Sequence, residues 1–127
     1  MPQAQNLTIN NAAAVAKTFT LYAPAPGDTG NAVWKLKEGA DARYFPTLTI
    51  GTKVSSQARK LTLRFRVPRD PLAGDNGGPA ASCFAAVDIT VPDQFPENMR
   101  NDWVAFLANI MNNADVKAAV RDAVPLT

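Results

Sequence analysis

Cationic side chains recur at every second position of the segment "QARKLTLRFRVPRDP", residues 57–71. Leucine, phenylalanine and valine alternate with a polar row of one parity: Lys60, Thr62, Arg64 and Arg66. Because successive side chains of a β-strand point to opposite faces, the pattern predicts a strand with one cationic and one apolar face. Cationic side chains bind phosphate, and arginine does so through paired hydrogen bonds. The pattern therefore favours a surface that binds nucleic acid.

The same charges have a second interpretation, since lysines on a strand also discourage aggregation between sheets. Residues 42–69 contain seven basic side chains and no acidic one, although the whole chain has a net charge of only +2. A long run of one sign favours phosphate binding over a mixed, solvated surface. For Lys60 and Arg64 taken alone, both interpretations stay open.

Enzymatic function is disfavoured by the residue types that are missing. The sequence contains no histidine, so it lacks the usual general base and any Ser–His or Cys–His pair. Asp93 and Glu97 do not form a catalytic carboxylate pair, because Glu97 stands where it complements the start of a predicted helix. The single cysteine, Cys83, excludes an intramolecular disulfide, and we expect it to be a small buried residue. We expect no enzyme activity, no cofactor and no metal site.

The length of 127 residues and the hydrophobic content of 46% predict a single domain over residues 1–127. The N-terminus "MPQAQNLTIN" lacks the basic and apolar regions of a signal peptide. No apolar run approaches the roughly 20 residues needed to cross a bilayer. We expect synthesis in the cytoplasm and no membrane partner.

In the first two-thirds of the chain, apolar and polar residues alternate as they do in half-buried strands. Turn-rich stretches separate six such segments, at residues 7–10, 14–23, 31–38, 45–54, 57–68 and 82–92. Short connections favour an antiparallel meander, with strands over about residues 7–92. Residues 69–81 are rich in proline and glycine, so they form a loop outside the sheet.

Near residue 95 the spacing of the apolar residues changes from that of strands to that of helices. Helices are predicted over about residues 96–112, starting at Pro96, and over about 115–124, ending before Pro125. Strands followed by helices indicate an α+β fold. The first helix carries large apolar residues at helical spacing: Trp103, Phe106, Leu107 and Ile110. These residues cover either the sheet of their own chain or that of a second subunit, and the second case makes an obligate homodimer.

Three segments carry a resemblance to a known family: "SSQARKLTLRFRVP", "CFAAVDITVP" and "NDWVAFLANIMNNADVKAAVRDAVP". The order and spacing of these segments and the total length of the chain resemble those of the coat proteins of single-stranded RNA bacteriophages, closer to the Q-beta (allolevivirus) type. The resemblance implies an N-terminal β-hairpin, a five-stranded antiparallel sheet and two C-terminal helices. It further implies that the helices interlock in a homodimer with a ten-stranded sheet, and that dimers close into an icosahedral capsid with the sheet facing the genome.

Family members also bind an RNA hairpin and repress translation of the replicase. The cationic row and the resemblance together give the predicted RNA-binding residues: Thr47, Thr49, Lys53, Lys60, Thr62, Arg64, Arg66, Phe84 and Asp88. The resemblance implies that Thr47 and Thr49 help to form an adenine pocket and that Phe84 stacks on a base. Ala58 and Ala86 depart from the family pattern, which has hydrogen-bonding side chains at both positions.

We therefore expect a capsid protein of the virion, made and assembled in the cytoplasm of a bacterial host. Its expected partners are further copies of itself, single-stranded genomic RNA and an RNA hairpin, and a maturation protein is a further candidate. The alternative is a dimeric RNA-binding translational regulator that does not assemble. The loop at residues 69–81 favours the capsid, since a shell needs an adaptable contact at its symmetry axes and a regulator does not.

Overall fold

The computed structural model describes residues 4–26, 29–38, 42–69 and 81–125. Its contacts divide the chain into two compact units, Met1–Pro92 with the strands and Asp93–Thr127 with the helices. The single domain over residues 1–127 stays a prediction.

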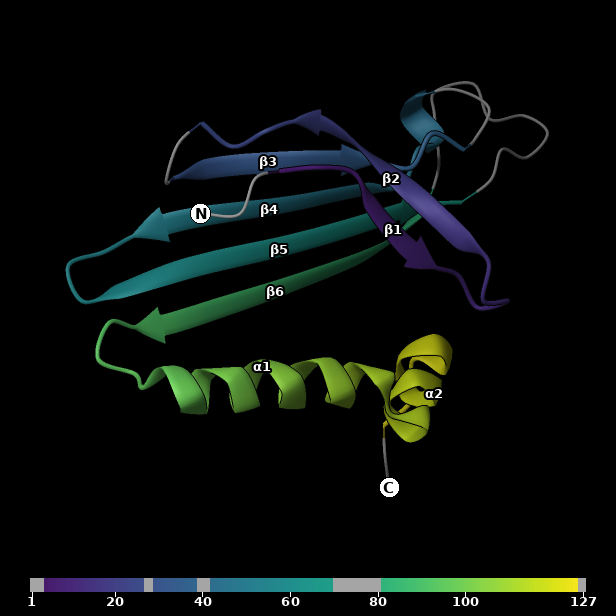
Figure 1. Ribbon diagram of the computed structural model, residues 1–127. Helices are drawn as coiled ribbons and strands as arrows, with labels where there is room; N and C mark the ends of the chain where they lie inside the picture. The colour runs from purple at the N-terminus through teal and green to yellow at the C-terminus, as the bar shows by residue number, and fades with distance from the viewer. Residues whose placement is uncertain (1–3, 27–28, 39–41, 70–80, 126–127) are drawn as a thin grey trace. The chain divides into compact units, whose positions relative to one another are not determined.

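The first unit is one antiparallel sheet whose strands follow one another in chain order (Figure 1). Its strands are β1 Leu7–Asn10, β2 Ala16–Ala23, β3 Gly30–Lys35, β4 Thr47–Val54, β5 Ala58–Pro68 and β6 Ser82–Pro92. The predicted meander is confirmed, with each strand inside or close to its predicted range. A short 3₁₀ helix, η1 Ala42–Tyr44, lies between β3 and β4.

The strand count implied by the resemblance was wrong by one. In the described part of the chain, the hairpin β1–β2 is followed by four strands rather than five. The physical reason is visible in the sequence itself, which offers only six segments with the alternation that a half-buried strand requires.

The core of this unit lies on one side of the sheet. Four buried side chains form it: Phe19, Ala32, Trp34 and Leu48. The rings of Phe19 on β2 and Phe65 on β5 lie 6.0 Å apart between centroids, so the hairpin packs on the apolar side of β5. The Trp34 indole N–H donates to the Gln5 carbonyl at 2.8 Å, which also holds the N-terminal segment to β3.

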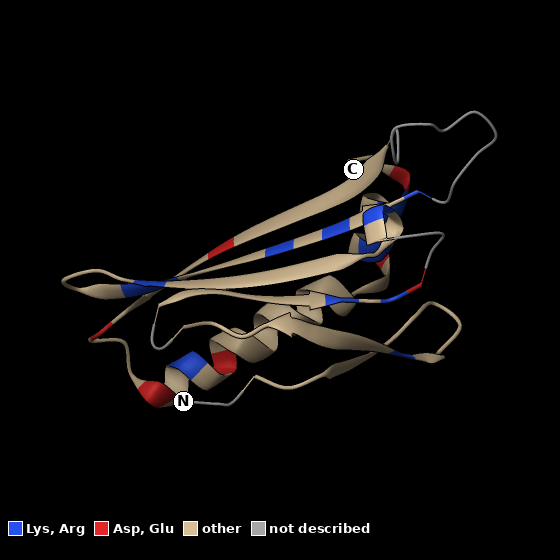
Figure 2. Ribbon diagram, turned by 90° about the horizontal axis from the view of Figure 1, so that it is seen from above, with Lys and Arg blue, Asp and Glu red and all other residues tan. Residues whose placement is uncertain are grey.

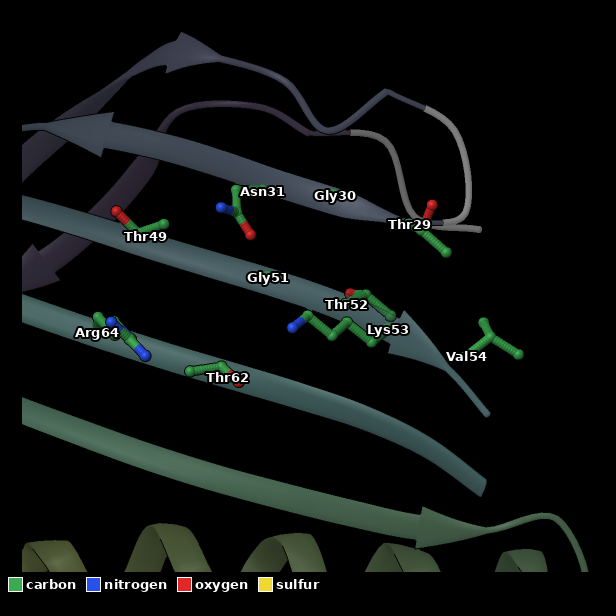
Figure 3. A pocket seen from close by; sticks show the side chains of 10 residues that line it. All are labelled: Thr29, Gly30, Asn31, Thr49, Gly51, Thr52, Lys53, Val54, Thr62 and Arg64. Carbon is green, nitrogen blue, oxygen red and sulfur yellow. The ribbon is translucent and has the colours of Figure 1, made fainter. Parts of the chain in front are cut away.

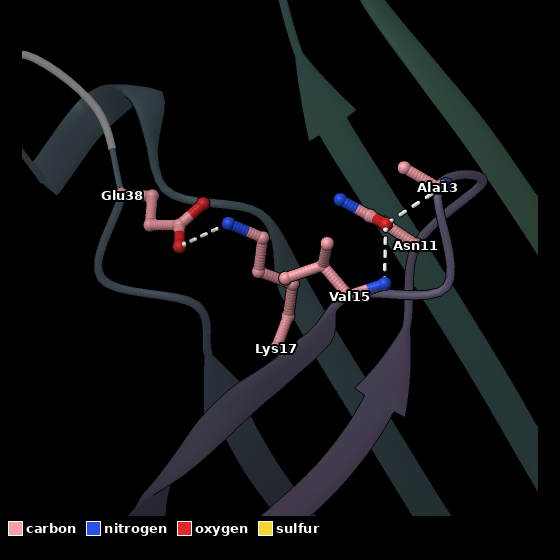
Figure 4. Close-up of polar contacts among 5 residues, drawn as sticks. All are labelled: Asn11, Ala13, Val15, Lys17 and Glu38. Carbon is pink, nitrogen blue, oxygen red and sulfur yellow. Dashed lines mark hydrogen bonds and ion pairs between the residues drawn. The ribbon is translucent and has the colours of Figure 1, made fainter.

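The β1–β2 hairpin is closed by a polar turn (Figure 4). The side-chain oxygen of Asn11 accepts hydrogen bonds from the backbone N–H groups of Ala13 and Val15 at 3.0 and 3.1 Å. Asparagine favours such turns because its side chain can replace a backbone acceptor. Lys17, on the next strand, pairs with Glu38 at 2.9 Å.

The predicted loop at residues 69–81 connects β5 to β6, and residues 70–80 lie outside the described residues. At its base the backbone N–H of Arg69 donates to the carbonyl of Ala81 at 3.1 Å. The expectation that Cys83 is buried was wrong, since its side chain is exposed. Cys83 stands near the start of β6, which among the described strands lies at the edge of the sheet and pairs with β5.

The second unit contains α1 Glu97–Asn112 and α2 Ala114–Asp122. Asn113 separates them, and its side-chain oxygen caps α2 by accepting from the N–H groups of Asp115 and Val116. α2 ends earlier than predicted, because Ala123 turns into the left-handed region with φ 54°. In the part of the chain described, no helix is long and apolar enough to cross a membrane.

Candidate nucleic-acid interface

The register of β4, β5 and β6 brings the predicted RNA-binding residues onto one side of the sheet. Thr47, Thr49 and Lys53 of β4 pair with Arg66, Arg64 and Lys60 of β5. In turn, Arg66 and Thr62 pair with Phe84 and Asp88 of β6. Because directly opposed residues of neighbouring strands share a face, all nine lie together. We call this side the cationic face, and we define it by these residues: Thr47, Thr49, Lys53, Lys60, Thr62, Arg64, Arg66, Phe84 and Asp88.

The charges of the cationic face are exposed and unbalanced. Figure 2 marks the positions of the basic and acidic residues on the ribbon. Four basic side chains and one carboxylate lie on it, all exposed: Lys53, Lys60, Arg64, Arg66 and Asp88. Among the described residues, no carboxylate lies within ion-pairing distance of these four cations. The Arg66 guanidinium donates to the Ser82 hydroxyl at 3.2 Å, which leaves its charge uncompensated. The arrangement provides cations that are free to bind phosphate.

A hollow of about 790 Å³ opens on this side of the sheet (Figure 3). The residues that line it are Thr29, Gly30, Asn31, Thr49, Gly51, Thr52, Lys53, Val54, Thr62 and Arg64. Four of them, Thr49, Lys53, Thr62 and Arg64, were predicted to bind RNA. Hydroxyl, amide and cationic groups around one hollow can hydrogen-bond the edge of an unpaired nucleobase and a nearby phosphate.

Asn31 and Gly51 are parts of the hollow that sequence reasoning missed. They lie opposite each other on β3 and β4, and Gly51 in turn lies opposite Thr62. A Cβ atom at position 51 would overlap the side-chain oxygen of Asn31. The glycine therefore makes room for the Asn31 amide. A glycine inside an alternating strand indicates such a close approach, and this signal could have identified both residues.

Thr47 and Phe84 lie on the cationic face but do not line the hollow. The Thr47 hydroxyl donates to the Phe45 carbonyl at 3.2 Å. Of the threonine pair for which the resemblance implied an adenine pocket, only Thr49 lines the hollow. The Phe84 side chain is 62% exposed, so its ring is open to stacking. The role of every residue of the cationic face in binding RNA stays a prediction.

The predicted interface residues of α1 lie on a helix without a buried side chain. Trp103, Phe106 and Ile110 are 37%, 68% and 54% exposed, and Leu107 is partly buried. Large apolar side chains at this spacing on an exposed helix indicate a surface that associates with another partner. Their role in dimerisation also stays a prediction.

Comparison with known families decides what kind of protein carries this face. A profile described as levivirus coat protein matches residues 2–126. The chain belongs to the levivirus coat protein family. This family is one of structural capsid proteins rather than enzymes, and its members are components of the virion. No match to this coat protein was found among curated protein sequences.

Solved structures of capsids have the same fold as this coat protein. The virus-like particle of bacteriophage NT-214 has 26% sequence identity and a TM-score of 0.82, covering 99% of this chain and 100% of the other. The particle of Beihai levi-like virus 21 has 16% identity and a TM-score of 0.85, with 99% of both chains covered. An unassembled bacteriophage coat protein dimer, described as RNA-binding, has 14% identity and a TM-score of 0.67, with 97% of both chains covered.

Proposed function

We propose that this coat protein forms a homodimer, that dimers assemble into an icosahedral shell, and that the cationic face binds the packaged single-stranded RNA. The observation that carries the proposal is the shared face of all nine predicted RNA-binding residues. Each dimer offers a modest number of cations. Many copies in a shell hold the RNA collectively, because multivalency multiplies weak contacts.

Two kinds of contact on the cationic face have different roles. Lys53, Lys60, Arg64 and Arg66 neutralise phosphates, which gives affinity without choice of sequence. Selection of a hairpin requires unpaired bases held by stacking and by edge contacts. Phe84 supplies an exposed ring, and the hollow at Asn31 and Thr49 supplies hydrogen-bonding groups. We propose that these groups bind an operator hairpin and thereby repress translation of the replicase.

Two surfaces of the chain support self-association. The first is the exposed apolar stripe of α1, which includes Trp103, Phe106 and Ile110. Burying each such side chain fully stabilises a complex by roughly 1.5–3 kcal/mol. The second is the outer edge of β6, an eleven-residue strand with one neighbour, β5. An unpaired edge of this length is a template for another strand, so a second copy can extend the sheet.

Size-exclusion chromatography and negative-stain microscopy of the purified protein test the assembly. The proposal predicts closed particles containing nuclease-protected RNA. The alternative, a translational regulator that does not assemble, predicts a dimer of about 27 kDa, twice the chain mass of 13.6 kDa, that binds RNA. A stable monomer, or particles that form without RNA and do not bind it, would contradict both functions.

A further inference from the structure

An exposed aromatic ring and a lysine extend the cationic face beyond the predicted residues. Lys35 of β3 lies directly opposite Thr47 of β4, so its side chain is on the same side of the sheet. Its ammonium group lies 4.1 Å from the centroid of the Tyr22 ring on β2. The Tyr22 side chain is 67% exposed.

Tyr22 lies at a β-bulge of β2. The pairing of β2 with β3 shifts between Leu21 and Ala23: Leu21 lies opposite Trp34, but Ala23 lies opposite Val33. The extra residue is Tyr22. Leu21 packs against the core on the apolar side, while Tyr22 contacts Lys35 on the cationic side. Tyr22 has the parity of Thr20, which lies opposite Lys35, so the alternation of the strand places its side chain on the cationic side.

The register places Thr20 of β2, Lys35 and Phe84 in one row across the sheet, and Tyr22 lies two residues from Thr20 along β2. Lys35 pairs with Thr47, Thr47 with Arg66, and Arg66 with Phe84. The row therefore contains two cations and ends at the exposed ring of Phe84, while the Tyr22 ring lies beside the row in contact with Lys35. From β2 to β6 there are four strand spacings, which amount to about 19 Å.

We propose that Tyr22 and Lys35 form a second stacking position for single-stranded RNA, which holds the strand where it leaves Phe84 and crosses the sheet. The inference rests on the proposed RNA-binding function of the cationic face. Lys35 covers one face of the Tyr22 ring, and the 67% exposure leaves the other face open to a base. The Lys35 ammonium then lies within reach of the phosphate that joins the stacked base to the next nucleotide.

The charge around Tyr22 favours RNA over a protein partner. An exposed ring can also form a contact between subunits, where aromatic residues are common. Interface centres are depleted of charge, however, and the row beside Tyr22 contains Lys35 and Arg66 with no carboxylate paired to either among the described residues. Base stacking on aromatic rings next to cations is the usual arrangement for single-stranded nucleic acid.

Filter binding of the full-length dimer to an unstructured oligouridylate of about 12 nucleotides tests the proposal. Tyr22→Ala is expected to weaken binding at least about fivefold and to leave the salt dependence unchanged, because it removes stacking and no charge. Tyr22→Phe, the matched control, keeps the ring and is expected to bind like the wild type. Lys35→Ala is expected to lower the salt slope by about 0.7, the value for one phosphate contact on a single strand.

Two further measurements and a replacement variant separate the outcomes. Lys60→Ala with Arg64→Ala tests the proposed function itself, so weaker binding there with unchanged binding in Tyr22→Ala would overturn this inference alone. Unchanged binding in both would overturn the proposed function as well. A lower particle yield in Tyr22→Ala with normal affinity for RNA would identify Tyr22 as a subunit contact and would also overturn the inference. If Tyr22→Ala does not fold, Tyr22→Leu replaces it, since it keeps apolar bulk without the ring.

Discussion

Removing two cations from the middle of the cationic face should change the salt dependence of RNA binding by a calculable amount. Lys60 and Arg64 are exposed, have no ion-pair partner among the described residues, and stand four residues apart on β5. That separation is about 13 Å, so the two side chains contact different phosphates. Each contact with a single strand contributes about 0.7 to the slope of log affinity against log salt. The double variant Lys60→Ala with Arg64→Ala should therefore lower the slope by about 1.4 for each chain that contacts RNA.

Filter binding to a single-stranded RNA between about 50 and 200 mM salt measures this change. A slope difference of about 1.4 reduces the ratio of wild-type to variant affinity about sevenfold over that range. Arg59→Ala with Lys117→Ala is the matched control. Arg59 is exposed and lies beside Lys60 on β5 with the opposite parity, and Lys117 lies on α2. Parallel salt curves for wild type and Lys60/Arg64 variant, or an equal change in the control, would refute the assignment of the cationic face.

Three further sets of substitutions test other parts of the structure. Trp103→Ala or Phe106→Ala should weaken the dimer by roughly 3–5 kcal/mol if the ring is buried between subunits, seen as dissociation on dilution in size-exclusion chromatography; an unchanged elution profile would exclude α1 as the interface. Gly51→Ala should displace the Asn31 amide and weaken RNA binding without affecting dimers. Adding Asn31→Ala should restore the space but not the amide. Equal RNA affinity in the wild type, the single variant and the double variant would show that the hollow binds no base. Asn113→Ala should cost about 1 kcal/mol of stability by removing the cap of α2, measured by thermal unfolding, and Asn113→Ser should retain most of it.

The alternating strands made most of the cationic face predictable from sequence. The parity of Lys60, Thr62, Arg64 and Arg66 fixes their common face once β5 is a strand, because the period of two leaves no other choice. The pairing of β4 with β5 then depends on placing the apolar side chains of both strands on the same side of the sheet. Leu48 and Phe65, which lie opposite each other, share the apolar side with the core, and this places Thr49 and Arg64 together on the other side.

Features that depend on irregular geometry were not predictable in the same way. The contact between Tyr22 and Lys35 is one example, because the alternation gives the side that Tyr22 shares with Thr20 but not the pairing of β2 with β3. The exposure of Cys83 depends on its place in the folded sheet, which composition does not reveal. The additional strand was expected from the family rather than from an alternating segment of this chain.

Ultraviolet cross-linking of RNA to protein in purified particles, with the linked residues identified by mass spectrometry, tests the central claim most directly. The predicted result is a set of cross-links on β4, β5 and β6 at positions of the cationic parity, with Phe84 among them. Cross-links that concentrate on α1, α2 or the apolar parity of β5 would contradict the claim that this side of the sheet faces the genome.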